Sequence, residues 1–289
     1  MTQEKRLSSE EVASFRADGY LLVPGFFTPE ELAPLQQDLA RDPTVGGFFF
    51  SVHDGDGVGP HDYMSWTRHQ DDYIGTATRL ARVVHGAEDL IGEPVYHYHS
   101  KMVRKPPGSP GKVDWHQDYG GWYQEGCLYA KMLTCAVAVT PAPEAAGCLR
   151  MLRGSHTLGR IDWISDETSY YSLYPPRLKA IMERFELVKL EMKPGDALFF
   201  HANVLHTSSS NSTDAPRTLM EFSFNALSNP PVFEGQDHHQ PKPMELADDD
   251  ALAAGRFQGV FGRTPLHDID NPEDKGYQIF HRQNLPSKS

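Results

Sequence analysis

The sequence has few cysteines, no long apolar run and no excess of positive charge. Its three cysteines, Cys127, Cys135 and Cys148, are an odd number without a Cys-x-x-Cys spacing, so neither a disulfide framework nor a structural zinc site is indicated. No apolar stretch reaches the roughly eighteen residues of a membrane span, and the polar amino terminus has no signal-peptide core. We therefore expect a cytoplasmic protein with no membrane partner.

The charge balance narrows the range of partners further. The formal net charge is −12, and no basic stripe interrupts the acidic surface. Nucleic acids and anionic membranes both attract clustered positive charge, so neither is an expected partner. The phosphates of coenzyme A would also need a basic patch, which favours a small-molecule metabolite or a natural-product intermediate as the ligand. No pattern in the sequence indicates an oligomeric state.

The chain reads as one domain of 289 residues in three sections. Residues 1–94 have mostly helical spacing, with one strand expected at Tyr20–Val23. Residues 95–228 alternate between apolar and polar positions in short runs separated by turns, which predicts an antiparallel sandwich or barrel. Residues 229–289 are polar and proline-rich and form a C-terminal extension. The fold class is therefore mainly β with flanking helices.

Two helices are marked in the first section by capping boxes. Ser8 with Glu11, and Thr28 with Glu31, have the spacing in which each side chain bonds to the backbone N–H of the other residue. Helical spacing returns over residues 72–91.

Two further segments have no clear hydrophobic period. Residues 41–66 are expected to form a long loop, in which Asp54-Gly-Asp56-Gly resembles a calcium loop but lacks its final acidic residue. His238 and His239, in the C-terminal extension, are expected to face solvent.

The segment His116-Gln-Asp118 carries the strongest chemical signal. In an extended chain, side chains two positions apart point the same way, so His116 and Asp118 converge on one point. An imidazole and a carboxylate so placed are two of the three ligands of the 2-His-1-carboxylate site of non-haem Fe(II) oxygenases. The alternative is a surface pair without metal. His201 and His206 compete for the third position.

An arginine and an alternating strand complete the candidate site. Arg217 follows His206 by eleven residues across a turn-rich segment, and its planar guanidinium suits a carboxylate anchor. The run from residue 95 to residue 104 alternates, which places His97, His99 and Lys101 on one face and Tyr96 and Tyr98 on the other. We expect the two histidines to flank a pocket.

Taken together, these motifs resemble the phytanoyl-CoA dioxygenase family of Fe(II)/2-oxoglutarate oxygenases. The resemblance spans about residues 20–225 and rests on the following segments: His116-Gln-Asp118, Gly147-Cys-Leu149 leading to Gly154-Ser-His156, Pro194-Gly-Asp196, and His206-Thr-Ser with Asn211 and Arg217. Two departures are Arg153, where a proline commonly precedes Gly-Ser-His, and the absence of tryptophan from residues 131–140. The longer signature of ectoine hydroxylases is not reproduced after Asp118.

The resemblance implies a double-stranded β-helix core of the jelly-roll, cupin-like type and a set of site residues. It places Fe(II) on His116, Asp118 and His206, and 2-oxoglutarate on Arg217. Further implied contacts to the co-substrate are Lys101 and either Thr134 or Cys135. The reaction would consume O2, oxidise the substrate and release succinate and CO2.

The resemblance also bears on the reaction type and on the substrate contacts. Related halogenases replace the carboxylate by a small residue to admit chloride, so Asp118 favours hydroxylation, or another oxidation such as desaturation. Tyr119, Trp122 and Tyr123 follow the motif and are candidates to line the pocket entrance, with His97 and His99 beside them. The alternative function is a non-catalytic jelly-roll protein that binds a metal or ligand; a metal-dependent hydrolase is weaker, because no motif positions a separate general base.

Overall fold

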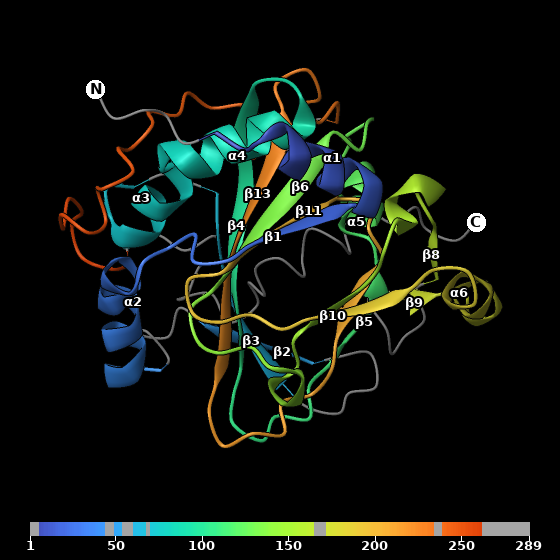
Figure 1. The fold of residues 1–289 in the computed structure, drawn as a ribbon, viewed down its shortest axis with the longest axis horizontal. Helices are drawn as coiled ribbons and strands as arrows, with labels where there is room; N and C mark the ends of the chain where they lie inside the picture. Colours follow the sequence, from blue (N-terminus) through green and yellow to red (C-terminus); the bar gives the residue numbers. More distant parts are fainter. Residues whose placement is uncertain are drawn as a thin grey trace.

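Two antiparallel sheets face each other, with helices packed around them (Figure 1). The structure, a computed structural model, describes residues 6–43, 49–53, 60–67, 70–164, 172–233 and 239–261. The large sheet runs in the order β1 (Tyr20–Val23), β11 (Ala197–His201), β6 (Met132–Ala138), β13 (Arg217–Ala226), β4 (Val95–Lys105), β3 (Pro60–Trp66) and β2 (Phe50–His53). The small sheet runs β10 (Leu187–Leu190), β7 (Leu149–Leu152), β12 (His206–Ser208) and β5 (Val113–His116). This arrangement is the jelly-roll core that the sequence predicted.

The remaining elements lie outside the two sheets. The helices are α1 (Ser9–Asp18), α2 (Pro29–Arg41), α3 (Tyr73–Arg79), α4 (Ala81–Ile91), α5 (Asp118–Gln124) and α6 (Pro175–Met182), with short 3-10 turns η1 (Glu144–Ala146) and η2 (Ser155–Leu158). The short strands β8 (Trp163–Ile164) and β9 (Ser172–Leu173) pair beside α6. Among the helices that the structure describes, none combines the length and the apolar character needed to cross a bilayer.

The outer face of the large sheet is covered by the amino-terminal helices. Leu35 of α2 and Val83 of α4 are fully buried in one cluster with Phe199 and Phe222 of the sheet. Burying a leucine or phenylalanine side chain contributes about 1.5–3 kcal/mol, so this cluster fixes the helices on the sheet. Both predicted capping boxes are present, at the starts of α1 and α2.

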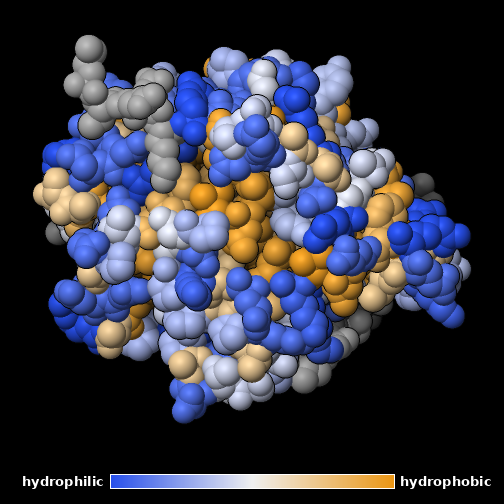
Figure 2. All heavy atoms as spheres, in the orientation of Figure 1, coloured by the Kyte–Doolittle hydropathy of each residue, from blue (hydrophilic) through white to orange (hydrophobic). Residues whose placement is uncertain are grey.

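A second apolar cluster fills part of the space between the sheets. It joins Ala136 of β6 and Leu219 of β13 to Leu149 and Met151 of β7. Figure 2 shows apolar side chains gathered in a hollow of the surface, in the region between β1 and β10 of Figure 1. The sheets are therefore held together by apolar contacts, and the polar site described below lies elsewhere in the same interlayer space.

Two expectations about the amino-terminal section are wrong. Residues 50–53 and 60–66, expected in a long loop, are strands β2 and β3, and β3 pairs with β4 through Ser65 opposite Lys101. The acidic Asp54-Gly-Asp56-Gly segment lies outside the described residues. The helix expected over residues 72–91 is two helices, because Leu80 adopts an extended conformation (φ −52°, ψ 132°).

A β-bulge in β4 changes which side chains share a face. Ser223 pairs with His99 and the next residue of β13, Phe224, pairs with His97, so Tyr98 is the extra residue on β4. His97 consequently lies on the helix side, with its ring 6.2 Å from Phe224 and its Nε2 2.6 Å from the Ser100 hydroxyl. His99 and Lys101 face the opposite side. The expectation that His97 shares their face is wrong, because strict alternation assumes a regular strand.

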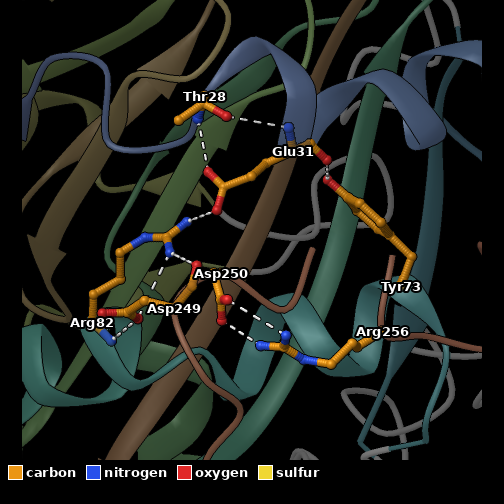
Figure 3. A network of polar contacts seen from close by, with 7 residues as sticks. All are labelled: Thr28, Glu31, Tyr73, Arg82, Asp249, Asp250 and Arg256. Atoms are coloured by element: carbon orange, nitrogen blue, oxygen red, sulfur yellow. Dashed lines mark hydrogen bonds and ion pairs between the residues drawn. The ribbon is translucent and has the colours of Figure 1, made fainter. Parts of the chain in front are cut away.

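The C-terminal segment 239–261 is anchored on Arg82, which also forms a buried ion pair (Figure 3). Arg82 of α4 contacts the Glu31 carboxylate at 2.7 Å, and both side chains are almost fully buried. The same arginine donates to the Asp249 carbonyl oxygen, and its backbone N–H donates to the Asp249 carboxylate at 2.7 Å. Tyr73 donates to the carbonyl oxygen of Glu31 at 2.8 Å. One arginine thus connects α2, α4 and the C-terminal segment.

Candidate metal centre

Two histidines lie side by side on neighbouring strands of the small sheet. His116 at the end of β5 pairs with His206 at the start of β12, and their ring centroids are 4.1 Å apart. The Nδ1 atoms lie 2.8 Å from the Asp114 carbonyl oxygen and 3.0 Å from that of Val204. Protonated Nδ1 atoms donate to these carbonyls, so each ring presents its Nε2 lone pair as a possible metal ligand.

Asp118 provides a carboxylate opposite both histidines. Its Oδ1 lies 3.5 Å from Nε2 of His116 and 3.8 Å from Nε2 of His206. The three candidate ligand atoms all lie within 4.8 Å of one another, and all three residues are buried. Adjacent ligands about 2.1 Å from one ion would be about 3 Å apart, so a small contraction would bring this set around a metal.

The surroundings favour the protonation states that a metal requires. Burial raises the pKa of the Asp118 carboxyl, but the nearby Lys101 ammonium and the His206 ring outweigh it, and the net pKa lies below its usual value. Burial lowers the pKa of His206 to about 3. At neutral pH the site therefore offers an ionised carboxylate and a neutral imidazole, which are the ligating forms.

His201 lies at a different place in the fold. It ends β11 in the large sheet, with its ring 5.4 Å from His156, and its Nδ1 accepts a hydrogen bond from the Asn203 backbone at 3.0 Å. Burial lowers its pKa to about 4. Of the two competing histidines, the structure brings only His206 to Asp118.

Arg217 begins β13 and is 1% exposed. Its Nη2 donates to the Gly147 carbonyl oxygen at 3.0 Å, whereas its Nε has no hydrogen-bond partner. Burial lowers its pKa to about 10, against the opposing influence of Glu221, so the guanidinium is still charged at neutral pH. Among the described residues no carboxylate forms an ion pair with it. A buried cation of this kind suits an anionic ligand.

A charged pair and two hydroxyls lie between the metal site and Arg217. Lys101 contacts Glu221 at 3.2 Å, and both side chains are largely buried. Burial lowers the pKa of Lys101, but the carboxylates of Glu221 and Asp118 outweigh it and raise that pKa above its usual value. The Thr134 hydroxyl donates to Asp118 at 3.4 Å and lies 3.0 Å from the Ser223 hydroxyl.

Glu221 and Tyr63 were not expected in the site. Glu221 stands four residues after Arg217 on one strand, so the period of two already places it on the same face. Tyr63 lies on β3, where the sequence suggested a loop; burial raises its pKa, and Lys101, Glu221 and Asp118 are among its charged neighbours.

One predicted co-substrate contact points away from the metal site, and one predicted entrance residue is partly exposed. Cys135 belongs to the core on the helix side of the large sheet, opposite to its neighbour Thr134, so the expectation that Cys135 contacts a co-substrate is wrong. Tyr123 of α5 is 38% exposed and carries the Arg160 guanidinium 4.1 Å from its ring centre. The alternation of a fully buried strand explains the first case, since each face of β6 has its own core.

Tyr119 and Trp122 are buried in a third cluster, next to His99. The Tyr119 hydroxyl donates to the Cys127 carbonyl oxygen at 3.1 Å. The Trp122 ring lies 5.7 Å from that of His99 and 5.6 Å from that of Tyr98. These side chains form a wall close to Asp118 rather than an exposed entrance.

Glu125 and His239 also belong to this wall. The sequence did not indicate a place in the site for either residue. His239, expected to face solvent, is 3% exposed; its ring stacks on Tyr98 at 4.0 Å, and its Nδ1 lies 3.4 Å from a carboxylate oxygen of Glu125. The solvent-facing expectation for His239 is therefore wrong. It failed because a polar, proline-rich sequence does not indicate which of its residues pack against a distant strand.

Comparison with known proteins agrees with this geometry. The family model described as phytanoyl-CoA dioxygenase (PhyH) matches residues 15–219. The chain belongs to the phytanoyl-CoA dioxygenase family. An ectoine dioxygenase of Bordetella parapertussis is 26% identical over 268 residues, covering 86% of this chain and 85% of the relative. An L-proline trans-4-hydroxylase of Streptomyces griseoviridis is 26% identical over 191 residues, covering 60% of this chain and 68% of the relative.

Solved structures share the fold at lower identity. EctD from S. alaskensis with 2-oxoglutarate and 5-hydroxyectoine has a TM-score of 0.69 and 22% identity, covering 86% of this chain and 90% of that one. The epimerase SnoN, in complex with Fe3+, alpha ketoglutarate and nogalamycin RO, has a TM-score of 0.64 and 24% identity, covering 83% and 91%. With the family assignment and the His-Asp-His set, this member is a non-haem iron, 2-oxoglutarate-dependent dioxygenase acting on small molecules.

Proposed function

We propose that His116, Asp118 and His206 hold the ferrous ion and that Arg217 binds the far carboxylate of 2-oxoglutarate. The observation that carries this proposal is the pairing of a complete, buried ligand set with a buried guanidinium that has no carboxylate partner among the described residues. When bound, the iron and the 2-oxo acid supply the activation of O2 for oxidation of a C–H bond, with release of succinate and CO2.

The protein's own groups orient the ligands and the co-substrate and exclude water from the site. The carbonyl oxygens of Asp114 and Val204 fix the imidazole rings, and the Thr134 hydroxyl holds one carboxylate oxygen of Asp118. Lys101, paired with Glu221, is placed to contact the co-substrate between the ion and Arg217. The buried wall formed by Trp122 and its neighbours keeps bulk water from this side of the site.

We propose a small-molecule metabolite or natural-product intermediate as the substrate, and hydroxylation as the reaction. The retained Asp118 carboxylate supports hydroxylation over halogenation. The family's ectoine and L-proline enzymes support a small polar substrate. Among the candidate substrate contacts, His99 and Trp122 line the wall beside Asp118, whereas His97 packs against Phe224 and Tyr123 is partly exposed beneath Arg160.

The test is a substrate screen that measures succinate formation under Fe(II), ascorbate and air, starting with small zwitterionic ring compounds such as ectoine and L-proline. A true substrate yields succinate and oxidised product in equal amounts. Asp118→Ala is expected to abolish this coupled turnover, because it removes the only carboxylate of the ligand set. Full coupled activity in that variant would refute the assignment. A protein that binds iron but forms no succinate with any substrate would favour the non-catalytic alternative.

A further inference from the structure

The metal ligand Asp118 stands on a helix that is weak on its own. Helix α5 has only seven residues, Asp-Tyr-Gly-Gly-Trp-Tyr-Gln, and its N-cap Gln117 makes no side-chain capping bond. Each interior glycine costs about 1 kcal/mol relative to alanine, and helices shorter than about 12 residues are marginal in isolation. The position of Asp118 therefore depends on contacts that hold both ends of α5 from outside.

The C-terminal end of α5 is held by a buried carboxylate. Glu125 is the C-cap residue and is 1% exposed. The Tyr98 hydroxyl donates to its Oε2, and Nδ1 of His239 lies 3.4 Å from the same oxygen. The rings of Tyr98 and His239 stack at 4.0 Å with an interplanar angle of 14°. Three segments far apart in sequence thus meet on one oxygen atom.

This polar centre connects to Asp118 along two routes. Along the helix, Trp122 lies one turn after Asp118 and packs against Tyr98 and His99. Across the sheet, His99 pairs with Ser223, whose hydroxyl contacts Thr134, which in turn donates to Asp118. A shift of the end of α5 would therefore reach the carboxylate through both routes.

His239 is fixed independently of Glu125. Its carbonyl oxygen accepts a hydrogen bond from Tyr96 at 3.0 Å, and Tyr96 accepts one from Asn225 at 2.9 Å. Further along the same segment, Asp249 is bound by Arg82 (Figure 3). The segment thus offers α5 a support that is itself attached to the large sheet and to α4.

We propose that Glu125, held by Tyr98 and His239, is a positioning residue for Asp118, so that the C-terminal segment sets the iron affinity of the site. This inference rests on the proposed iron site. Partners that orient metal ligands without touching the metal typically change affinity by about 10–100-fold when removed. The 2-oxoglutarate anchor should be unaffected, because Arg217 lies at the opposite end of the ten-residue strand β13 from Asn225.

The experiment compares the full-length protein with Glu125→Gln and His239→Phe. The first keeps the side-chain shape without the charge, and the second keeps the stacked ring without its nitrogen. We expect Fe(II) affinity, measured anaerobically against a competing chelator, to fall about tenfold or more in both. The half-saturating 2-oxoglutarate concentration should change less than about twofold. The ligand-field spectrum of the Co(II)-loaded variants should differ from that of the wild type, and His239→Gln, which restores an N–H donor, should recover part of the affinity.

Controls separate this role from a general loss of stability. Glu183→Gln replaces an exposed carboxylate at the end of α6 and should leave metal affinity unchanged. If Glu125→Gln and His239→Phe lower the melting temperature but the folded protein keeps wild-type Fe(II) affinity and the wild-type Co(II) spectrum, the inference is overturned and the contact is only structural. If the wild type itself binds no iron, the proposed function fails instead, so the two failures are distinguishable.

Discussion

At the scale of single residues, the most informative side chain is Arg217. A guanidinium inside a protein loses its hydration and needs an anionic partner, yet the described residues give Arg217 a carbonyl oxygen and no carboxylate ion pair. The nearest candidate, Glu221, is held by Lys101 at 3.2 Å. One positive charge is therefore left over, which matches the carboxylate of one 2-oxoglutarate molecule.

Replacing Arg217 should therefore weaken 2-oxoglutarate binding selectively. Truncating one partner of a buried charged hydrogen bond costs about 2–5 kcal/mol, so Arg217→Ala should raise the half-saturating 2-oxoglutarate concentration about thirtyfold or more. Arg217→Lys should lie in between, because lysine keeps the charge but not the two-pronged geometry. Steady-state succinate formation at varied 2-oxoglutarate concentration measures the half-saturating value of each variant. Arg184→Ala, at an exposed position, is the control. An unchanged requirement would show that another residue is the anchor.

Sequence reasoning worked best where one local pattern determined the answer. His116 and Asp118 are two positions apart, and the motif at His206 with Arg217 selected one of two histidines. Glu125 and His239 gave no such signal, because their partners lie far away in the chain and neither segment is periodic. Tertiary contact alone turns the polar His239 into a buried residue.

At the scale of elements, α5 and β4 show how local irregularity shapes the site. The bulge at Tyr98 lets adjacent residues of β4, Tyr98 and His99, both contact Trp122. No residue type in this segment indicates a bulge, so the alternation of the sequence predicted the wrong face for His97. The helix α5 is equally unexpected, because its two glycines argue against a helix.

The amino-terminal end of α5 depends on Gln117, which stands between two predicted ligands. Its amide nitrogen donates to the carbonyl oxygens of Gly159 at 2.8 Å and Asn203 at 2.6 Å, and its amide oxygen accepts from Ile161 at 2.8 Å. The residue is fully buried. Its side chain therefore connects two loops, one at residues 159–161 and one at Asn203.

Removing this amide should destabilise the fold. Gln117→Leu removes the partners of two buried backbone groups and one half-buried one. A buried group left unpaired costs about 1–3 kcal/mol, so we expect a loss of about 3 kcal/mol in the free energy of unfolding. Urea unfolding of the iron-free protein measures it. Gln124→Leu, at a half-buried position of the same helix, is the matched control and should cost less than about 1 kcal/mol. Equal losses in the two variants would contradict a special role for Gln117.

At the scale of the whole molecule, the large sheet draws strands from well beyond the section 95–228. It includes β1, β2 and β3 from the amino-terminal section. Alternating runs and turns predicted an antiparallel sandwich or barrel, and the family resemblance implied the jelly-roll class. The membership of these three strands was not predictable, because long-range pairing has no local signature. The division of the chain into three sections stays a prediction.

The ion pair of Arg82 joins three of these distant parts. Arg82→Met should lower the free energy of unfolding by about 3–5 kcal/mol, because it leaves the Glu31 carboxylate buried without its cation. The double variant Arg82→Met/Glu31→Gln should recover much of that loss in urea titrations. Arg41→Met is the control: its ion pair with Asp38 lies at the surface, with the Arg41 side chain 77% exposed, so about 1 kcal/mol or less is at stake. A double variant as unstable as the single one would contradict the explanation.

The pH dependence of stability tests the buried carboxylate of Glu125. Burial raises its pKa to about 7, against the opposing hydrogen bond from Tyr98, and the other titratable groups facing it are His239 and Cys127. A raised carboxyl pKa means that the folded state holds the proton more tightly than the unfolded chain. Its stabilising contribution is present below about pH 4.5 and is lost as the pH rises through about 7.

The wild type should therefore lose stability relative to Glu125→Gln between about pH 5 and about pH 8. The comparison is made by urea unfolding of the iron-free proteins at successive pH values. Both proteins carry the same metal-ligand residues, and the substitution removes only the titrating carboxyl of Glu125. A difference between wild type and Glu125→Gln that does not change with pH would show that this carboxyl does not titrate in that range.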